Sequence, residues 1–206
     1  MLREFAFYPL TLDRWSDFEQ VMGPQGACYG CWCSYFAIPL ALRRDMSGSD
    51  KKAHMLERVR MGPPPGLLAY DEGRPVGWVQ VTPRKSVVNW NSPRTVSRPL
   101  SADDADDPGC WAVSCFFIAS GSRGKGLSHA LLDAAVRHVR DQGARMLEAC
   151  PINQAKHSKS VGLFVGPTNI FKQAGFREVA LRKEGRPLMR LEFSAPDAAN
   201  GQQAAK

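Results

Sequence analysis

The sequence predicts a mixed α/β protein built on one central sheet, and three observations carry this prediction. An apolar run of strand length, residues 110–118, leads through a glycine-rich turn into an amphipathic helical pattern over residues 124–142. Residues 66–82 and 176–193 each have the pattern of two strands joined by a short turn. Because strands and helices alternate along the chain, we expect about seven strands flanked by about four helices.

The first sixty residues predict one strand and two helices. Residues 4–9 have the pattern of an opening strand, and Asp13 caps a helical pattern that continues to Met22. A second helical pattern covers residues 50–61 and ends at the sequence GPPPG. We therefore expect the strand to lead into two helices before the first hairpin.

The middle of the chain predicts a hairpin followed by a long irregular segment. The strands at residues 66–70 and 76–82 are joined by the turn DEGRP, in which Gly73 suits a positive φ. Residues 84–109 contain three prolines, little periodicity and an acidic run. We expect this segment to be a long excursion whose acidic run is solvated.

The C-terminal part predicts a strand, a short helix and a closing hairpin. Residues 145–150 form the strand, residues 169–173 the helix, and residues 176–181 and 187–193 the hairpin. We expect one domain over residues 4–194. Because it has no apolar anchor, the last segment is expected to be a disordered tail, residues 195–206.

Composition and charge restrict the class of protein. The 206 residues fit one ordinary domain, and we find neither a secretion signal nor an apolar run long enough to cross a bilayer. A soluble cytoplasmic protein without membrane contact is the expectation. The net charge of +7 arises in residues 121–206, which hold 14 basic and 7 acidic side chains. This favours an anionic ligand, whereas nucleic-acid binding lacks a basic stripe with interleaved aromatics.

The glycine-rich turn at residues 122–128 is the strongest candidate for binding that anion. It follows an apolar strand and opens a helix, so its backbone amides can point at a phosphate without obstruction by side chains. The spacing matches neither the dinucleotide fingerprint nor the Walker loop. A different kind of phosphate-binding protein is therefore expected.

The turn resembles the R/Q-x-x-G-x-G/A signature of the GNAT superfamily of acyl-CoA-dependent N-acyltransferases, with Ser128 as the departure, and the order of elements over residues 4–194 is also similar. The resemblance implies acetyl-CoA as co-substrate and a sheet splayed between its fourth and fifth strands. It also implies that the turn amides hold the pyrophosphate and that the strand before them pairs with the pantetheine arm. The implied CoA-binding residues are Phe116, Phe117, Ile118, Arg123, Gly124, Lys125, Gly126, Leu127, Ser128 and Phe171.

The acid and base of the reaction are less well defined. Phe171 stands where many members of the superfamily have a tyrosine, and a phenyl ring cannot donate a proton. Cys150, Tyr35 or an ordered water are open alternatives for the acid. Glu148, an isolated carboxylate in an apolar strand, is the candidate that collects the proton of the amine. Strand alternation leaves open that it faces solvent or a neighbouring arginine.

The sequence CYGCWCSYF at residues 28–36 has the most unusual local composition. In the superfamily this region borders the acceptor, so Trp32, Tyr35 and Phe36 are expected to line the acceptor pocket. The three cysteines leave a tetrahedral zinc site incomplete, so we expect no metal. A zinc site completed from a distance and a redox relay at Cys28 and Cys31 are the alternatives to simple packing of thiols.

Together these features predict transfer of an acetyl group from acetyl-CoA to a primary amine of a small molecule or amino acid by direct attack. The alternative is a non-catalytic acyl-CoA-binding sensor or interaction module. The expected partner is a small-molecule amine acceptor, and a homodimer is left open.

Overall fold

The protein forms a seven-stranded mixed sheet in the order β1-β2-β3-β4-β5-β7-β6. The structure is a computed structural model and describes residues 4–153 and 163–193. Every neighbouring pair of strands is antiparallel except β4 and β5, which are parallel. The seven strands predicted from the sequence are confirmed within two residues at each end. Their bounds are β1 Phe5–Pro9, β2 Gly66–Asp71, β3 Arg74–Pro83, β4 Cys110–Ile118, β5 Met146–Ala149, β6 Arg177–Leu181 and β7 Pro187–Glu192.

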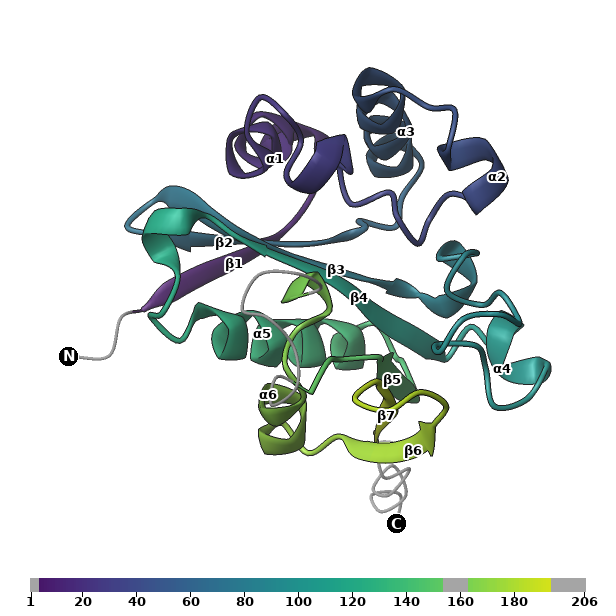
Figure 1. Ribbon diagram of the computed structural model, residues 1–206. Coiled ribbons are helices and arrows are strands. Elements are labelled where there is room, and N and C mark those ends of the chain that lie inside the picture. The colour runs from purple at the N-terminus through teal and green to yellow at the C-terminus, as the bar shows by residue number, and fades with distance from the viewer. Residues whose placement is uncertain (1–3, 154–162, 194–206) are drawn as a thin grey trace, which may run out of the picture.

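Helices cover both faces of this sheet (Figure 1). The α1 and α3 helices lie on one face, and α5 and α6 lie on the other. These are the four helices that the sequence predicts. Within the described residues, none of the helices is both long and apolar enough to cross a membrane. The helical segments are α1 Trp15–Met22, α2 Leu40–Arg43, α3 Gly48–Met61, α4 Asp103–Asp106, α5 Leu127–Asp141 and α6 Thr168–Gln173, with 3₁₀ turns η1 Leu12–Arg14, η2 Cys28–Gly30, η3 Arg84–Ser86, η4 Ser120–Ser122 and η6 Leu163–Val165.

Local sequence explains where the longest helices begin. Ser47 and Asp50 form a reciprocal capping box at the start of α3, which satisfies two backbone amides that lack helical partners. The α5 helix begins after Gly126, whose φ of 78° is the left-handed conformation that glycine adopts easily. The buried residues of α5 recur at helical spacing and therefore lie on one face of the helix. They are Leu127, Leu131, Leu132, Ala134, Ala135 and Val139.

The sheet opens between β4 and β5. The β5 strand pairs with β4 only over Cys110–Val113, whereas β4 continues for five more residues, to Ile118. On its other side β4 stays paired with β3 to its last residue, with one register shift that leaves Ser114 as an extra residue. The second half of β4 therefore has an edge without β5, and this is the splay that the sequence resemblance implies.

Three apolar clusters fill the two sides of the sheet. One lies between the sheet and α5, and includes Leu131, Val81 and Phe171. On the opposite face, a second cluster lies beneath α1 and α3 around Trp78, and a third surrounds Trp90. The candidate site is formed by the second half of β4 and the glycine turn that follows it.

The segment between β3 and β4 differs from the prediction of a solvated excursion. It is irregular, as expected, but Arg84 and Trp90 are fully buried. The acidic run is also partly paired, because Asp104 contacts Arg190 and Asp107 contacts Arg145. Asp103 and Asp106 are exposed as predicted, whereas solvation was predicted wrongly for Asp104 and Asp107, because their basic partners lie 86 and 38 residues further along the chain. The predicted tail, residues 195–206, lies outside the described residues.

Candidate active site

The glycine turn presents an open set of backbone amides. Gly124 and Gly126 have φ values of 72° and 78°, and a Cβ built on either would meet no atom within 4 Å. Among the described residues, none accepts a hydrogen bond from the amides of residues 124–128. These amides are the free donors that the start of a long helix offers to an anion. The backbone here fits the pyrophosphate of CoA.

The two basic side chains of the turn are held by the backbone. The Nε atom of Arg123 donates to the carbonyl of Ile118 at 3.0 Å, and Nζ of Lys125 donates to the carbonyl of Gly121 at 2.7 Å. Both residues are exposed. Arg123 uses Nε for the strand, and its terminal nitrogens bond to no other residue that the structure describes, so they can donate to an anion beside the turn.

On the side where β5 has ended, the strand that the resemblance assigns to pantetheine has no backbone hydrogen bond to another described residue, although the η6 turn lies close to it. Phe116, Phe117 and Ile118 pair with β3 on one side, and β5 has ended on the other. Phe171 is fully buried and stacks edge-on against Phe116, with ring centroids 6.1 Å apart. Its ring therefore supports the strand from the α5 face of the sheet. The CoA-binding roles of these residues stay predictions.

The three aromatic residues predicted to line the acceptor pocket lie in different environments. Trp32 is 5% exposed and packs on Phe18 in the cluster beneath α1 and α3, with centroids 6.2 Å apart. Phe36 is buried and stacks edge-on against Trp90 at 5.1 Å. Tyr35 is 44% exposed, so it is the one of the three that can meet an acceptor from solvent. The acceptor role of all three stays a prediction.

An unusual backbone separates these aromatic side chains. Ala27, Tyr29, Trp32 and Cys33 all have positive φ, between 45° and 63°. Non-glycine residues adopt this region rarely, and each costs of order 1 kcal/mol. The loop stays in this conformation because Trp32 is buried and its amide donates to the carbonyl of Gly26. The sequence carries no signal for this conformation, because none of the four residues is a type that favours it.

Three polar side chains lie buried together at the bulge of β4, and none of them is among the site residues predicted from the sequence. The Oγ atom of Ser114 donates to Oε1 of Gln80 at 2.8 Å, and both residues are 0% exposed. Nε2 of Gln80 and Oγ1 of Thr82 are buried without a partner among the described residues. We call Gln80, Thr82 and Ser114 the polar band. Strand alternation in the run VGWVQVT could have revealed it, because Gln80 and Thr82 interrupt an apolar strand on one face.

Glu148 lies inside an ion-paired cluster. Its carboxylate is 0% exposed, forms an ion pair with Arg84, and accepts hydrogen bonds from Arg190 at 2.8 and 2.9 Å. Burial lowers the pKa of Arg84 to about 10, so this guanidinium is still charged at pH 7. A carboxylate held by two guanidinium groups is stabilised in its charged form, which opposes uptake of a proton. The catalytic role of Glu148 stays a prediction, and these contacts support the alternative of arginine pairing.

The two side chains considered as alternative proton donors, Cys150 and Tyr35, differ in exposure. Cys150 is 2% exposed, and burial raises the pKa of its thiol. Tyr35 is accessible, and the guanidinium of Arg43 lies 3.9 Å from its ring centroid.

Among residues 4–153 and 163–193, no three His, Cys, Asp or Glu side chains gather closely enough to hold a metal ion.

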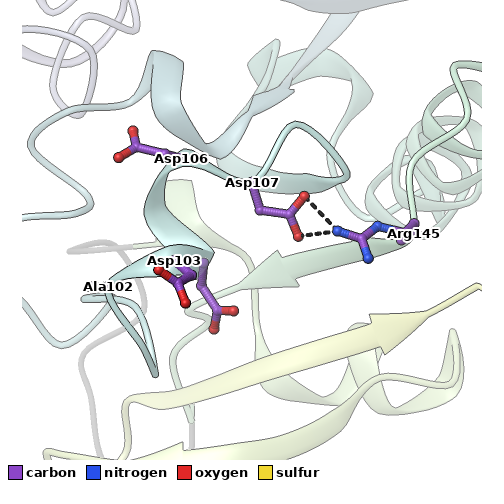
Figure 2. A pocket seen from close by; sticks show the side chains of 6 residues that line it. Ala102, Asp103, Asp106, Asp107 and Arg145 are labelled. Atoms are coloured by element: carbon purple, nitrogen blue, oxygen red, sulfur yellow. Dashed lines mark hydrogen bonds and ion pairs between the residues drawn. The ribbon is translucent and has the colours of Figure 1, made fainter.

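A hollow in the surface lies away from this site. It is lined by the acidic residues around α4 and by Arg145, whose Nη2 donates to both carboxylate oxygens of Asp107 at 2.7 and 2.8 Å (Figure 2). These residues flank the start of β4, whereas the glycine turn follows its end. The hollow is therefore separate from the candidate site.

A mixed sheet opened beside β4, followed by an amide-lined turn at the start of the next helix, defines the class of CoA-dependent acyltransferases. The model of the acetyltransferase (GNAT) family matches residues 34–164, which include the opening and the turn. The chain belongs to the acetyltransferase (GNAT) family, whose members transfer acyl groups from acetyl-CoA. No curated protein matches the sequence.

Solved structures show the same fold at low sequence identity. A GNAT family acetyltransferase from Listeria monocytogenes is 14% identical, with a TM-score of 0.57 over 93% of this chain and 96% of its own. A ribosomal-protein-alanine N-acetyltransferase from Brucella melitensis is 19% identical, with a TM-score of 0.54 over 91% and 99%. The PaiA N-acetyltransferase from Thermoplasma acidophilum, solved with coenzyme A, is 10% identical, with a TM-score of 0.51 over 92% and 99%.

Proposed function

We propose that this protein transfers an acetyl group from acetyl-CoA to a primary amine of a small molecule or amino acid. The observation that carries the proposal is the second half of β4, whose outer edge and following turn have backbone amides without a hydrogen-bond partner among the described residues. A single extended ligand can therefore pair with the strand and place a diphosphate on the turn. CoA has this shape and charge.

The same contacts assign roles within CoA binding. The backbone of residues 116–118 pairs with the pantetheine arm, and the amides of residues 124–128 hold the pyrophosphate beside Arg123. Arg123 adds charge-assisted hydrogen bonds to the phosphate, and Phe171 supports Phe116 from below. The thioester then lies near the bulge of β4, one or two residues before Phe116.

The acceptor amine reaches this thioester from the face that carries the polar band. Thr82 and Gln80 keep a hydroxyl and an amide donor without a partner among the described residues, but both side chains are buried, so they support this face from inside the protein and Tyr35 is the exposed contact for the acceptor. The neutral amine attacks the thioester carbonyl directly, and the CoA thiolate leaves. Because an ordinary thiol has a pKa of about 8.5, this leaving group tolerates the absence of a tyrosine at position 171.

An acetylation screen tests the proposal. Purified protein is incubated with acetyl-CoA and with amines, amino acids and aminoglycosides, and free CoA is measured. We expect release of CoA above hydrolysis with at least one primary amine, together with an acetylated product by mass spectrometry. CoA binding by calorimetry without turnover of any amine would contradict transfer and support the acyl-CoA sensor.

The exposed tyrosine of the loop gives a prediction about the acceptor. Tyr35→Ala is expected to raise the KM for the acceptor by about 3–10-fold, because it removes an aromatic surface worth about 1 kcal/mol, while CoA affinity is unchanged. Tyr29→Ala is the matched control, because Tyr29 belongs to the same loop and is fully exposed. Equal kinetics for the two variants would exclude Tyr35 from the acceptor pocket.

A further inference from the structure

Two buried thiols meet across the second apolar cluster. The Sγ atoms of Cys33 and Cys115 lie 3.4 Å apart, although the residues are 82 positions apart in the chain. Cys33 is 3% exposed and belongs to the strained loop, whereas Cys115 is 9% exposed and belongs to β4. All six cysteines are free thiols in this structure.

The surroundings bring the two sulfur atoms together. Cys33 has a φ of 52° and follows Trp32, which is itself at a positive φ and buried against Phe18. Cys33, whose thiol contacts Cys115 of β4, therefore has an unfavourable backbone conformation. Such strain persists where the surrounding structure enforces it, and it occurs at sites with a specific role.

We propose that Cys33 and Cys115 are a redox-active pair that a peroxide converts to a disulfide, which fixes the strained loop to β4. The sulfur atoms need to approach by about 1.4 Å to reach a bond length of about 2.0 Å. A change of side-chain torsion or a small shift of the loop supplies a movement of this size.

The chemistry divides the two thiols into an attacking and a resolving partner. Cys115 is the more exposed, so its sulfur attacks the O–O bond of the peroxide, which breaks to give a sulfenic acid and one water. Cys33 then attacks this sulfur and displaces hydroxide, which leaves as the second water after taking the thiol proton. Two thiols are oxidised, and one peroxide is reduced to two waters.

The electrostatic environment agrees with this order. The contact with Cys115 and burial raise the pKa of Cys33 well above its usual value, so this thiol keeps its proton in the reduced protein. A protonated thiol is a poor nucleophile towards peroxide. Once a sulfenic acid forms on Cys115, the neighbouring Cys33 is held at contact distance and needs no diffusion to reach it.

Peptide mapping of the native protein tests the proposal. The reduced protein is treated with hydrogen peroxide, alkylated and digested without reduction, and the peptides are identified by mass spectrometry. We expect a linked pair containing Cys33 and Cys115, lighter by two hydrogens than the separate peptides. Mapping needs no turnover, so its outcome is independent of the proposed acetyl transfer.

Variants separate this pair from the other thiols of the loop. Cys28→Ser together with Cys31→Ser should still form the link, whereas Cys33→Ser and Cys115→Ala should each abolish it. In protein with wild-type Cys33 and Cys115, oxidation should raise the melting temperature by roughly 5–15 °C, which Cys33→Ser should remove. Oxidation of Cys28 or Cys31 without a Cys33–Cys115 link, or a link from Cys33 to either of them, would overturn the proposal.

Discussion

Replacing Gly126 by aspartate is expected to raise the dissociation constant for CoA by about 100-fold or more. The carboxylate would lie beside the amides of residues 124–128, where the pyrophosphate is proposed to bind. Two like charges about 4 Å apart near a protein surface repel by about 1–4 kcal/mol, and about 2.7 kcal/mol corresponds to 100-fold. Calorimetry with CoA measures the change directly.

Two controls separate charge from backbone strain. Gly73→Asp places the same side chain at the same φ of 78° with equally open space, but in the turn between β2 and β3. It should leave CoA affinity unchanged. Gly126→Ala carries the strain without the charge and should weaken binding less than aspartate does. Unaltered CoA affinity in a folded Gly126→Asp protein would remove the pyrophosphate from this turn.

The second large effect is expected at Glu148. Glu148→Gln should lower the free energy of unfolding by about 3–5 kcal/mol, because it leaves the buried guanidinium of Arg84 without its counter-charge. For a chain of this length, the melting temperature should fall by roughly 6–20 °C. Glu192→Gln is the control, since Glu192 lies exposed on the neighbouring β7 strand.

The same variant distinguishes pairing from catalysis. At a temperature where Glu148→Gln is folded, arginine pairing predicts a kcat within about tenfold of the parent enzyme. Loss of a catalytic base would instead reduce kcat by about 10²–10⁴-fold. Replacing both Arg84 by methionine and Glu148 by leucine should restore part of the lost stability. A variant with unchanged stability and a large loss of kcat would establish Glu148 as the base.

The elements that the sequence predicts well are those with a strong local period. The apolar run of β4 and the heptad-like face of α5 contain enough apolar positions to specify element and orientation, and the glycine turn follows from its position between them. Gln80 and Thr82 interrupt the apolar strand VGWVQVT, so the local sequence also indicates polar positions on one face of that strand. These features depend on residues that are near neighbours in the chain.

The ion pairs of Glu148, and the packing of Trp32 and Phe36 into different clusters, depend instead on tertiary structure. Arg84 and Arg190 lie 64 and 42 positions from Glu148; sheet register places Arg190 opposite Glu148, and the η3 turn after β3 brings Arg84 to it. Trp32 and Phe36 enter different clusters because Trp32 and Cys33 adopt positive φ, which tertiary packing imposes against local preference. No local pattern contains this information.

The irregular segment between β3 and β4 depends for its order on an arginine that follows β6. The guanidinium of Arg182, which follows β6, donates to the carbonyls of Val96, Arg98 and Pro99. During synthesis these carbonyls leave the ribosome more than eighty residues before Arg182 does. The segment therefore has no partner for this part of its backbone until the last hairpin has been translated. Its final structure therefore forms only after Arg182 has left the ribosome, even though the hairpin of β2 and β3 beside it can pair as soon as it emerges.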